Sequence, residues 1–308
     1  MMDWTDRHCR YFHRLIAPNV TLYTEMVTTG ALIHGDNERF LRFDPAEHPV
    51  VLQLGGSDPE ALATTAKMGA EAGYDEINLN CGCPSDRVQS GAFGAILMKD
   101  PTRVRDCISA MKKAVSIPVT VKCRIGVDDC EDLEFLTTFI RTVQDGGCDT
   151  FIVHARKAWL KGLSPKENRE VPPLQYDLVR EVRGMFPDLN IQLNGGVKTI
   201  EDTQAHLENF DGVMIGREAY QNPWVLHHVE KEIFGTADLL SEREVIERMV
   251  EYIEQQQRDY DTPIKSITRH MTGLFKGQVG GRRWRQLLST EAHKLETKAD
   301  FLLDAMPE

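Results

Sequence analysis

A short apolar run that recurs along the chain is the feature that most constrains the fold. The runs are rich in valine and isoleucine, and helical patterns such as DPEALATTAKMGAEAG and DPTRVRDCISAMKKAV follow them. Buried strands that alternate with helices indicate parallel β/α units, so we predict an α/β fold of the (β/α)8 TIM-barrel type. Seven runs occur, at residues 21–26, 50–56, 76–80, 118–126, 150–156, 191–196 and 212–217.

The eighth strand of such a barrel has no match in the chain. The sequence opens on a helical pattern, DRHCRYFHRLI, with Thr5 as the predicted N-cap, and a barrel helix normally follows a strand. We therefore expect the first strand to be largely missing, with Met1-Met2-Asp3 as its last remnant, because the chain is truncated or its start was assigned late. The alternative is an overlooked strand within 27–49 or 157–173.

The β/α alternation stops after about residue 235. Residues 240–302 show only helical periodicity, as in EREVIERMVEYIEQQQ and again from HMTGLFKG onward, with Gly280-Gly281 as a break. The expected organisation is a barrel domain over residues 1–235 and a small all-helical domain over residues 236–308.

Charge is unevenly distributed along the chain. The net charge of −11 argues against a nucleic-acid partner, because affinity for phosphate comes from Lys and Arg. The stretch 231–262 carries nine acids against four bases, whereas 264–288 carries six bases and no acid. This split predicts one basic face on an acidic protein, which suits a selective RNA-binding protein. The six bases are Lys265, Arg269, Lys276, Arg282, Arg283 and Arg285.

The cysteines and the lack of long apolar runs exclude several classes of protein. Seven cysteines, an odd number without a C-x-x-C pair, fit neither a disulfide framework nor a zinc finger. No apolar run approaches the ~20 residues of a membrane span, and the first residues, MMDWTDRHCR, are charged where a signal peptide is apolar. We therefore expect reduced thiols, no metal, no membrane contact, a cytoplasmic location and a monomer.

Candidate site residues close the predicted strands. In barrels of this type the active site gathers at the C-terminal ends of the strands. The polar residues found there are Glu25, Gln53, Asn80, Lys122, Arg124, His154, Arg156, Asn194 and Arg217.

Glycines at the last two strand ends indicate a phosphate site. Asn194-Gly195-Gly196 and Gly216-Arg217 close these runs, and glycines there let backbone N–H groups approach a phosphate while an arginine adds charge. Either group alone could be a simple turn, but the pair favours a phosphate-bearing ligand. Its place in a barrel, not after the first strand of an open sheet, indicates a mononucleotide such as FMN.

Three more strand-end residues suit a flavin to different degrees. Lys122 can place a positive charge beside the pyrimidine edge of a reduced flavin. Gln53 can donate and accept hydrogen bonds at the amide edge of the ring. His154 stays open, since a histidine at a strand end is as often a core residue as a ligand.

Cys83 follows Gly82 and precedes Pro84 in the turn after the third run. A thiol held by such a turn above the barrel mouth is accessible and positioned, as a nucleophile or proton donor must be. Cys81 could pair with Cys83 in a metal site, but the C-x-C pattern lacks neighbouring ligands. A buried spectator thiol is the default interpretation of the other five cysteines.

Nine stretches of the chain carry a family resemblance: DWTDRHCR (3–10), YTEMVTTGA (23–31), LQLGGSDP (52–59), INLNCGCPSDRV (77–88), VTVKCRIG (119–126), FIVHARKAWLKGLSPKENRE (151–170), LNGG (193–196), MIGREAYQNPW (214–224) and ITRHMTGLFKG (267–277). They strongly resemble the tRNA-dihydrouridine synthases, specifically the A-type bacterial branch. The resemblance implies an FMN-containing barrel followed by a helical tRNA-binding domain. It also implies reduction of the C5=C6 bond of uridines in the tRNA D-loop, at positions 20 and 20a, with NADPH reducing the flavin.

The resemblance also implies roles for single residues. Cys83 would be the general acid, protonating C5 of the uracil from the face opposite to the flavin N5, which would deliver hydride to C6; Cys81 would be an apolar filler. The tRNA would contact Asn80 and Arg169, with Lys166, Arg282 and Arg285 as an RNA-binding signature of the branch. FMN would contact Met1, Met2, Gln53, Lys122, His154, Asn194, Gly195, Gly196, Gly216 and Arg217.

The chain departs from the family at its N-terminus. The first strand of the family ends in Ala-Pro-Met, of which only Met1-Met2 remain, so part of the flavin cradle is expected to be absent. Trp159, in KAWLKG, either stacks on RNA or anchors its loop. Two alternatives are a flavin barrel acting on a small pyrimidine such as dihydroorotate, which leaves the basic helices unexplained, and an RNA-binding protein without flavin.

Overall fold

The seven predicted runs all form strands of one parallel sheet. The computed structural model describes residues 1–85, 93–294 and 297–307, and within them the strands follow each other in chain order. The prediction of parallel β/α units is therefore confirmed. The strands are β1 (Leu22–Thr28), β2 (Val50–Gly55), β3 (Glu76–Cys81), β4 (Val119–Arg124), β5 (Thr150–His154), β6 (Asn190–Asn194) and β7 (Gly212–Met214).

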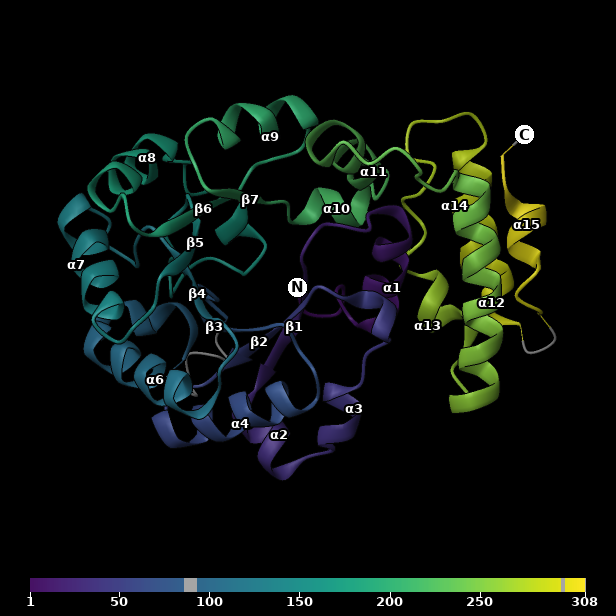
Figure 1. Ribbon diagram of the computed structural model, residues 1–308. Coiled ribbons are helices and arrows are strands. Elements are labelled where there is room, and N and C mark those ends of the chain that lie inside the picture. The colour runs from purple at the N-terminus through teal and green to yellow at the C-terminus, as the bar shows by residue number, and fades with distance from the viewer. Residues whose placement is uncertain (86–92, 295–296, 308) are drawn as a thin grey trace.

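The sheet curls into an open barrel, as Figure 1 shows. Among the described residues β1 pairs only with β2 and β7 only with β6, so the two ends of the sheet do not join. Residues 29–49 and 157–173 are fully described and add no strand to the sheet. The alternative of an overlooked strand there is therefore wrong, and the described residues form seven of the eight strands that the barrel type predicts.

The helices between the strands cover the outer face of the sheet (Figure 1). Aspartate N-caps begin four of them: Asp36, Asp58, Asp100 and Asp132 each accept a backbone N–H of the first turn. Proline at the first or second helical position supports two of these starts. The helices of this layer are α2 (Thr29–His34), α3 (Asn37–Leu41), α4 (Pro59–Glu71), α6 (Pro101–Ala114), α7 (Leu133–Gln144), α8 (Tyr176–Met185) and α9 (Ile200–Leu207), with 3-10 turns η1 (Pro45–Glu47), η2 (Gly94–Lys99) and η3 (Glu167–Arg169).

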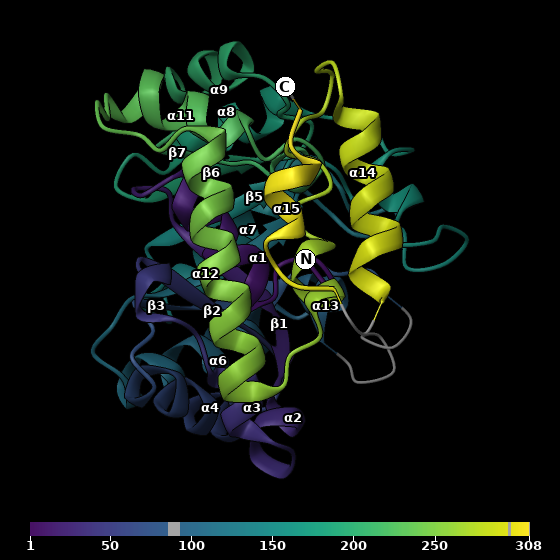
Figure 2. The same cartoon turned by 90° about the vertical axis from the view of Figure 1, so that its right-hand side faces the viewer.

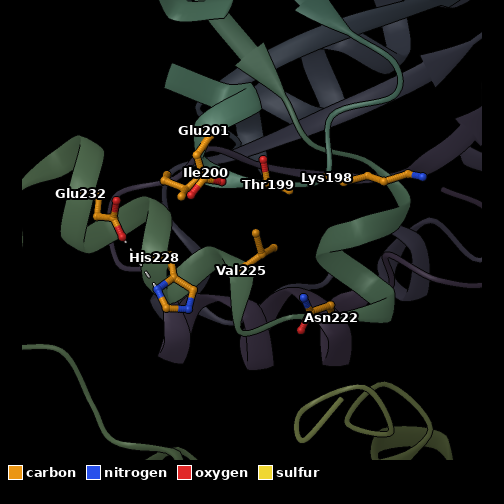
Figure 3. A pocket seen from close by; sticks show the side chains of 8 residues that line it. All are labelled: Lys198, Thr199, Ile200, Glu201, Asn222, Val225, His228 and Glu232. Carbon is orange, nitrogen blue, oxygen red and sulfur yellow. Dashed lines mark ion pairs between the residues drawn. The ribbon is translucent and has the colours of Figure 1, made fainter. Parts of the chain in front are cut away.

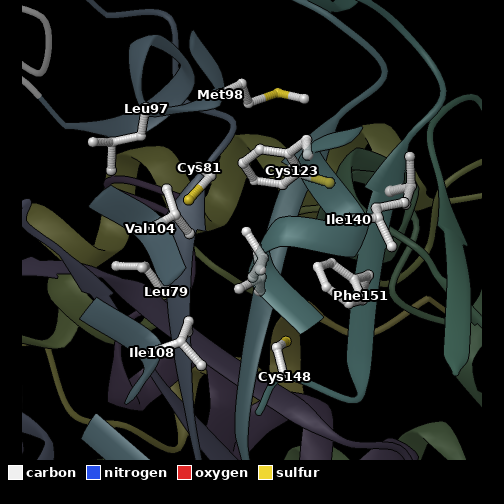
Figure 4. Packing of buried hydrophobic residues seen from close by; sticks show 14 of the residues in the cluster. Leu79, Cys81, Leu97, Met98, Val104, Ile108, Cys123, Ile140, Cys148 and Phe151 are labelled. Atoms are coloured by element: carbon white, nitrogen blue, oxygen red, sulfur yellow. The ribbon is translucent and has the colours of Figure 1, made fainter. Parts of the chain in front are cut away.

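The strands present different residues to their two faces, as the period of two requires. Ile77, Leu79 and Cys81 of β3 belong to the apolar cluster between sheet and helices. Figure 4 shows Leu79 and Cys81 beside Val104 and Ile108 of α6. Cys81 is fully buried in this layer, so the prediction that it fills space is confirmed.

Helix α1 (Arg7–Ile16) lies between the β1 end of the sheet and the helices that follow β7 (Figure 1). Its N-cap is Asp6, whose carboxylate accepts the N–H groups of His8 and Cys9, so the prediction of Thr5 is wrong. Asp6 prevails because its carboxylate reaches two backbone donors of the first turn. A buried ion pair between Arg10 and Glu47, 2.6 Å long, ties α1 to η1.

The described residues after β7 form helices and turns and add no strand. The elements are α10 (Arg217–Gln221), α11 (Val225–Val229), the π-helix η4 (Glu230–Phe234), α12 (Glu242–Tyr260), α13 (Ile264–Thr268), α14 (Gly281–Thr290), the 3-10 turn η5 (Glu291–His293) and α15 (Phe301–Ala305). Figure 2 shows α12, α14 and α15 side by side. No helix of the described chain is long and apolar enough to cross a membrane. The domain boundary between residues 235 and 236 stays a prediction.

The C-terminal helices share an apolar core with α1 and α11, separate from the core between the sheet and its helices. Trp284 of α14 is fully buried in a cluster that includes Phe12 of α1 and Leu226 of α11. Residues 270–277, predicted as helical, form turns instead. Gly273 and the left-handed Gly277 (φ 83°) break the helix, and a Cβ on Gly273 would lie 2.6 Å from the carbonyl oxygen of Gln221.

Candidate active site

The sheet register gathers the predicted site residues at the C-terminal edge of the strands. Asn80 of β3 pairs with Lys122 of β4, and His154 of β5 pairs with both Arg124 and Asn194. Register partners in a sheet project to the same face, so these side chains lie on one side of the sheet. Chain segments more than a hundred residues apart thus form one polar wall.

Cys83 lies on a turn held by side-chain hydrogen bonds and by the Ala95 N–H, which donates to the Cys83 carbonyl at 2.9 Å. Asn80 Oδ1 accepts the backbone N–H of Gly82 at 3.0 Å and that of Cys83 at 2.9 Å. The guanidinium of Arg124 donates to the Gly82 carbonyl at 2.8 Å. The Cys83 thiol is free and partly exposed, whereas the Cys81 thiol is buried. The turn therefore presents one of the two thiols and hides the other.

Asn80 has a structural role, because its side chain links the Cys83 turn to Gln53. Both polar atoms of its side chain are engaged, since Nδ2 donates to Gln53 Oε1 at 2.8 Å while Oδ1 holds the Cys83 turn. Its predicted contact with tRNA stays a prediction. Residues 86–88 of the INLNCGCPSDRV stretch lie outside the described residues.

Lys122 is a partly buried cation whose side chain bonds to Asn194. Its ammonium donates to Asn194 Oδ1 at 3.0 Å, and Asn194 donates in turn to the Met214 carbonyl at 2.8 Å. Burial, with the neighbouring Arg124 as a second cause, lowers the pKa of Lys122 from 10.5 to about 8. Lys122 is therefore charged at neutral pH and titrates just above it.

Because of this pKa, the stability of the apoprotein is expected to rise with pH relative to a Lys122→Met variant. The folded lysine releases its proton near pH 8 and the unfolded one near 10.5. Between these values the unfolded state binds more protons, so the free energy of unfolding increases with pH, by about 2 kcal/mol from pH 7 to 9.5. Urea denaturation of both proteins at the two pH values measures this. A constant difference between them would contradict the lowered pKa.

His154 and the two glycines after β6 pack closely. Burial, then the charges of Arg124 and Lys122, keep the pKa of His154 well below its usual range, so its imidazole is neutral. Gly195 and Gly196 adopt left-handed backbone (φ 111° and 77°), and a Cβ on Gly195 would lie 2.5 Å from the His154 ring. Tyr176 donates to the Gly195 carbonyl at 2.8 Å. Only glycine fits this turn, which leaves its backbone open to a ligand.

Arginines surround the last strand ends. Arg217, the first residue of α10 after Gly216, pairs with Glu170 at 2.7 Å and donates to the Arg169 carbonyl at 3.1 Å. Arg156 donates to the carbonyls of Glu170 and Pro172. Its Nε is buried without a hydrogen-bond partner among the described residues. An unpartnered guanidinium N–H beside further positive charge fits an anion such as a phosphate.

The loop after β5 carries Lys166 and Arg169 to the rim of the site. Asn168 is fully buried and fastens this loop by accepting the Trp159 N–H at 2.8 Å and donating to the Trp159 carbonyl at 3.0 Å. Arg124 reaches the Asn168 carbonyl at 2.9 Å. Trp159 is partly buried, with the Lys157 ammonium 4.3 Å from its ring centre, and both interpretations of it stay open.

Arg124, Asn168 and Arg156 were not among the residues given a role from the sequence. Arg124 links the Cys83 turn to the loop after β5 through carbonyl groups, and such contacts leave no motif. Its position two residues after Lys122 is the one available signal, because residues two apart on a strand share a face.

Met1 and Met2 lie in the opening of the barrel. Figure 1 shows the N-terminus at the open side of the sheet, between its β1 and β7 ends. The Met1 ammonium donates to Thr5 Oγ1 at 2.6 Å; burial lowers its pKa to about 6, and the charges of Glu25 and Lys122 also act on it. Met2 is 58% exposed. Their contact with FMN stays a prediction.

Arg282 and Arg285 lie on the outer face of α14. Both are exposed, while Trp284 and Leu288 between and beyond them are buried. Figure 2 places α14 on the same side of the molecule as the teal loop after β5, which carries Lys166.

One hollow of about 340 Å³ lies away from these residues, at the N-terminus of α9 (Figure 3). It contains none of the predicted site residues, and its lining is Lys198, Thr199, Ile200, Glu201, Asn222, Val225, His228 and Glu232. Within residues 1–85, 93–294 and 297–307, no group of His, Cys, Asp or Glu side chains is arranged to hold a metal ion.

The family model and the similar curated proteins agree on one family. A family model described as dihydrouridine synthase (Dus) matches residues 1–307. The tRNA-dihydrouridine(20/20a) synthase of Vibrio vulnificus is 55% identical over 308 residues, covering 99% of this chain and 94% of that protein. The synthase of the same name from Escherichia coli strain K12 is 56% identical over 308 residues, covering 99% and 89%. Morphinone reductase in complex with tetrahydroNAD shares the fold alone, with a TM-score of 0.51 at 12% identity over 79% of this chain and 86% of that one.

Proposed function

Because this chain belongs to the dihydrouridine synthase family, we propose that it reduces uridines 20 and 20a of the tRNA D-loop to 5,6-dihydrouridine. The chain is then an oxidoreductase that acts on the C5=C6 bond of uracil. The observation that carries the proposal is the Cys83 turn, which holds a free thiol beside Lys122, Arg124 and Asn80 at the strand ends.

A flavin mononucleotide fits the residues present. The left-handed glycine turn at 195–196 and the unpartnered Nε of Arg156 suit a phosphate, and the partly buried ammonium of Lys122 suits an electron-rich ring. The chemistry that FMN would supply there, after reduction by NADPH, is the hydride for C6 of the uracil. The residues that would hold FMN are Met1, Met2, Gln53, Lys122, His154, Asn194, Gly195, Gly196, Gly216 and Arg217.

Cys83 supplies the proton for C5. Its thiol is free and partly exposed, as a positioned proton donor must be. Asn80 and Arg124 hold the backbone of the turn from both sides, which limits the positions that the thiol can take. A positioned general acid typically contributes about 10²- to 10⁴-fold to the rate.

The tRNA contacts the rim and the helices. Uridine must leave its stack to reach the site, at a cost of a few kcal/mol that phosphate contacts offset. Lys166 and Arg169 on the loop after β5, and Arg282 and Arg285 on α14, provide these contacts, with Asn80 close to the base. The helical part, residues 236–308, is then the tRNA-binding domain of a cytoplasmic monomer that needs no metal.

Dihydrouridine mapping tests the proposal. The protein is incubated with FMN, NADPH and unmodified tRNA, and the tRNA is digested and mapped by mass spectrometry. We expect dihydrouridine at positions 20 and 20a, and none at these positions in a control tRNA that carries cytidine there. Turnover of dihydroorotate without any dihydrouridine in tRNA would support the small-pyrimidine alternative, and tRNA binding by a colourless, inactive protein would support the RNA-binding one.

A further inference from the structure

Five side chains inside the barrel form one continuous chain of hydrogen bonds that ends at the Cys83 turn. Thr120 donates to Glu76 at 2.5 Å, and Asn78 Nδ2 donates to Thr120 at 2.8 Å. Gln53 Nε2 donates to Asn78 Oδ1 at 2.9 Å, and Asn80 Nδ2 donates to Gln53 Oε1 at 2.8 Å. Asn80 Oδ1 then accepts the N–H groups of the turn.

The sheet register explains why these side chains meet. Asn78 of β3 is the register partner of Gln53 on β2 and of Thr120 on β4, so the three form one layer across neighbouring strands. Glu76 and Asn80 lie two residues before and after Asn78, and therefore on the same face of β3. The chain of bonds runs along β3, from its first residue to the turn that follows it.

Both ends of the chain fix its direction. At the Cys83 end the backbone N–H groups can only donate, so Asn80 must present its oxygen to them and its NH₂ to Gln53. Gln53 must then accept with its oxygen and donate with its nitrogen, which requires the oxygen of Asn78. At the other end Glu76 accepts from Thr120 and, at 3.5 Å, from Tyr23. Each amide therefore has one permitted orientation.

Burial stabilises this arrangement of the hydrogen bonds. Asn78 is 0% exposed and Thr120 1%, so water cannot replace a lost partner. In such surroundings hydrogen bonds are strong, and an unpaired group is costly. Asn78 is the central member of these five side chains. Its hydrogen-bond partners on both sides, Gln53 and Thr120, are buried side chains of the same network, which holds for none of the other four.

We propose that Asn78 is a positioning residue for the active site, which sets the amide orientation of Gln53 and, through Asn80, holds the Cys83 turn. Once its two bonds within the protein are made, the Gln53 amide keeps one N–H and one lone pair for a ligand. This donor and acceptor match an adjacent carbonyl and N–H of a flavin pyrimidine edge. The inference rests on the proposed function for the identity of that ligand, but the hold on Cys83 does not depend on it.

Two variants of Asn78 separate positioning from a merely structural role. Asn78→Leu removes both bonds at similar size, whereas Asn78→Asp, kept protonated by burial, retains an oxygen for Gln53 Nε2 and an O–H for Thr120. Leu79→Ala is the matched control, since it weakens the outer face of the same strand without touching the chain of bonds. Thr120→Val, which keeps the shape of the side chain, replaces Asn78→Leu if that variant does not fold.

The readouts are FMN affinity, measured by quenching of flavin fluorescence, and the alkylation rate of Cys83 in the apoprotein, mapped by mass spectrometry. For Asn78→Leu we expect about tenfold weaker FMN binding and an altered Cys83 alkylation rate. Asn78→Asp is expected to stay near wild type in FMN affinity, and Leu79→Ala in both readouts. Thr120→Val is expected to shift both in the direction of Asn78→Leu.

The proposal is overturned if Asn78→Leu behaves as wild type, or if Leu79→Ala loses as much as Asn78→Leu. Failure of the proposed function would be visible separately, as wild-type protein that makes no dihydrouridine. The alkylation comparison keeps its meaning in that case, because it needs neither flavin nor tRNA.

Discussion

Replacing Cys83 by alanine is expected to slow dihydrouridine formation by about 10²- to 10⁴-fold while FMN binding stays near wild type. The thiol is the proposed proton source for C5, and it lies on a turn whose backbone is held by Asn80 and Arg124, not by the thiol itself. Removing the sulfur should therefore leave the turn and the flavin contacts in place. The measurement is single-turnover formation of dihydrouridine in tRNA, with FMN affinity determined in parallel.

Cys81→Ala is the matched control for this experiment. It removes a thiol two residues away that is fully buried under α6, so we expect a stability loss of roughly 1 kcal/mol and no change in the rate. Cys83→Ser keeps a hydroxyl of higher pKa and is expected to be intermediate. Equal rates for Cys83→Ala and wild type would mean that another group protonates C5.

The parts of the molecule that were predictable from sequence are those set by local pattern. A run such as VVLQLG must be buried on both sides, and its flanks fix where β2 begins and ends. The same local logic separated Cys83 from Cys81, because one lies in the alternation of a strand and the other in a turn between Gly82 and Pro84.

The parts that were missed depend on contacts between distant segments. The polar residues of EINLN read as one face of a strand, and only the curled sheet shows that this face is enclosed and joined to Gln53 and Thr120. The carbonyls that Arg124 binds lie up to 44 residues away in sequence. The helix likewise breaks at Gly273 because of a distant contact, since a Cβ there would clash with the carbonyl oxygen of Gln221 on another element.

The double variant Arg282→Glu/Arg285→Glu is expected to weaken tRNA binding by roughly 10- to 100-fold and to lower the slope of log affinity against log salt by about two. Both side chains are exposed on α14, and the buried Trp284 anchors the helix beneath them, so the fold should persist. Because these contacts are remote from Cys83, the loss should appear in KM for tRNA, while kcat stays close to wild type. Filter binding across a salt series and steady-state kinetics measure the two effects.

Arg243→Glu/Arg258→Glu on α12 makes the identical change in net charge and provides the control. Arg243 and Arg258 are exposed but lie in the acidic stretch, paired with Glu247 and Asp259. If α14 contacts phosphates directly, only the α14 variant should lose salt dependence, because counterions are released only where phosphates are neutralised. If both variants weaken binding equally, net charge governs the association, and the two arginines of α14 have no special role. The comparison thus decides whether the basic residues of 264–288 bind tRNA directly or only add to the overall electrostatic attraction of the protein for tRNA.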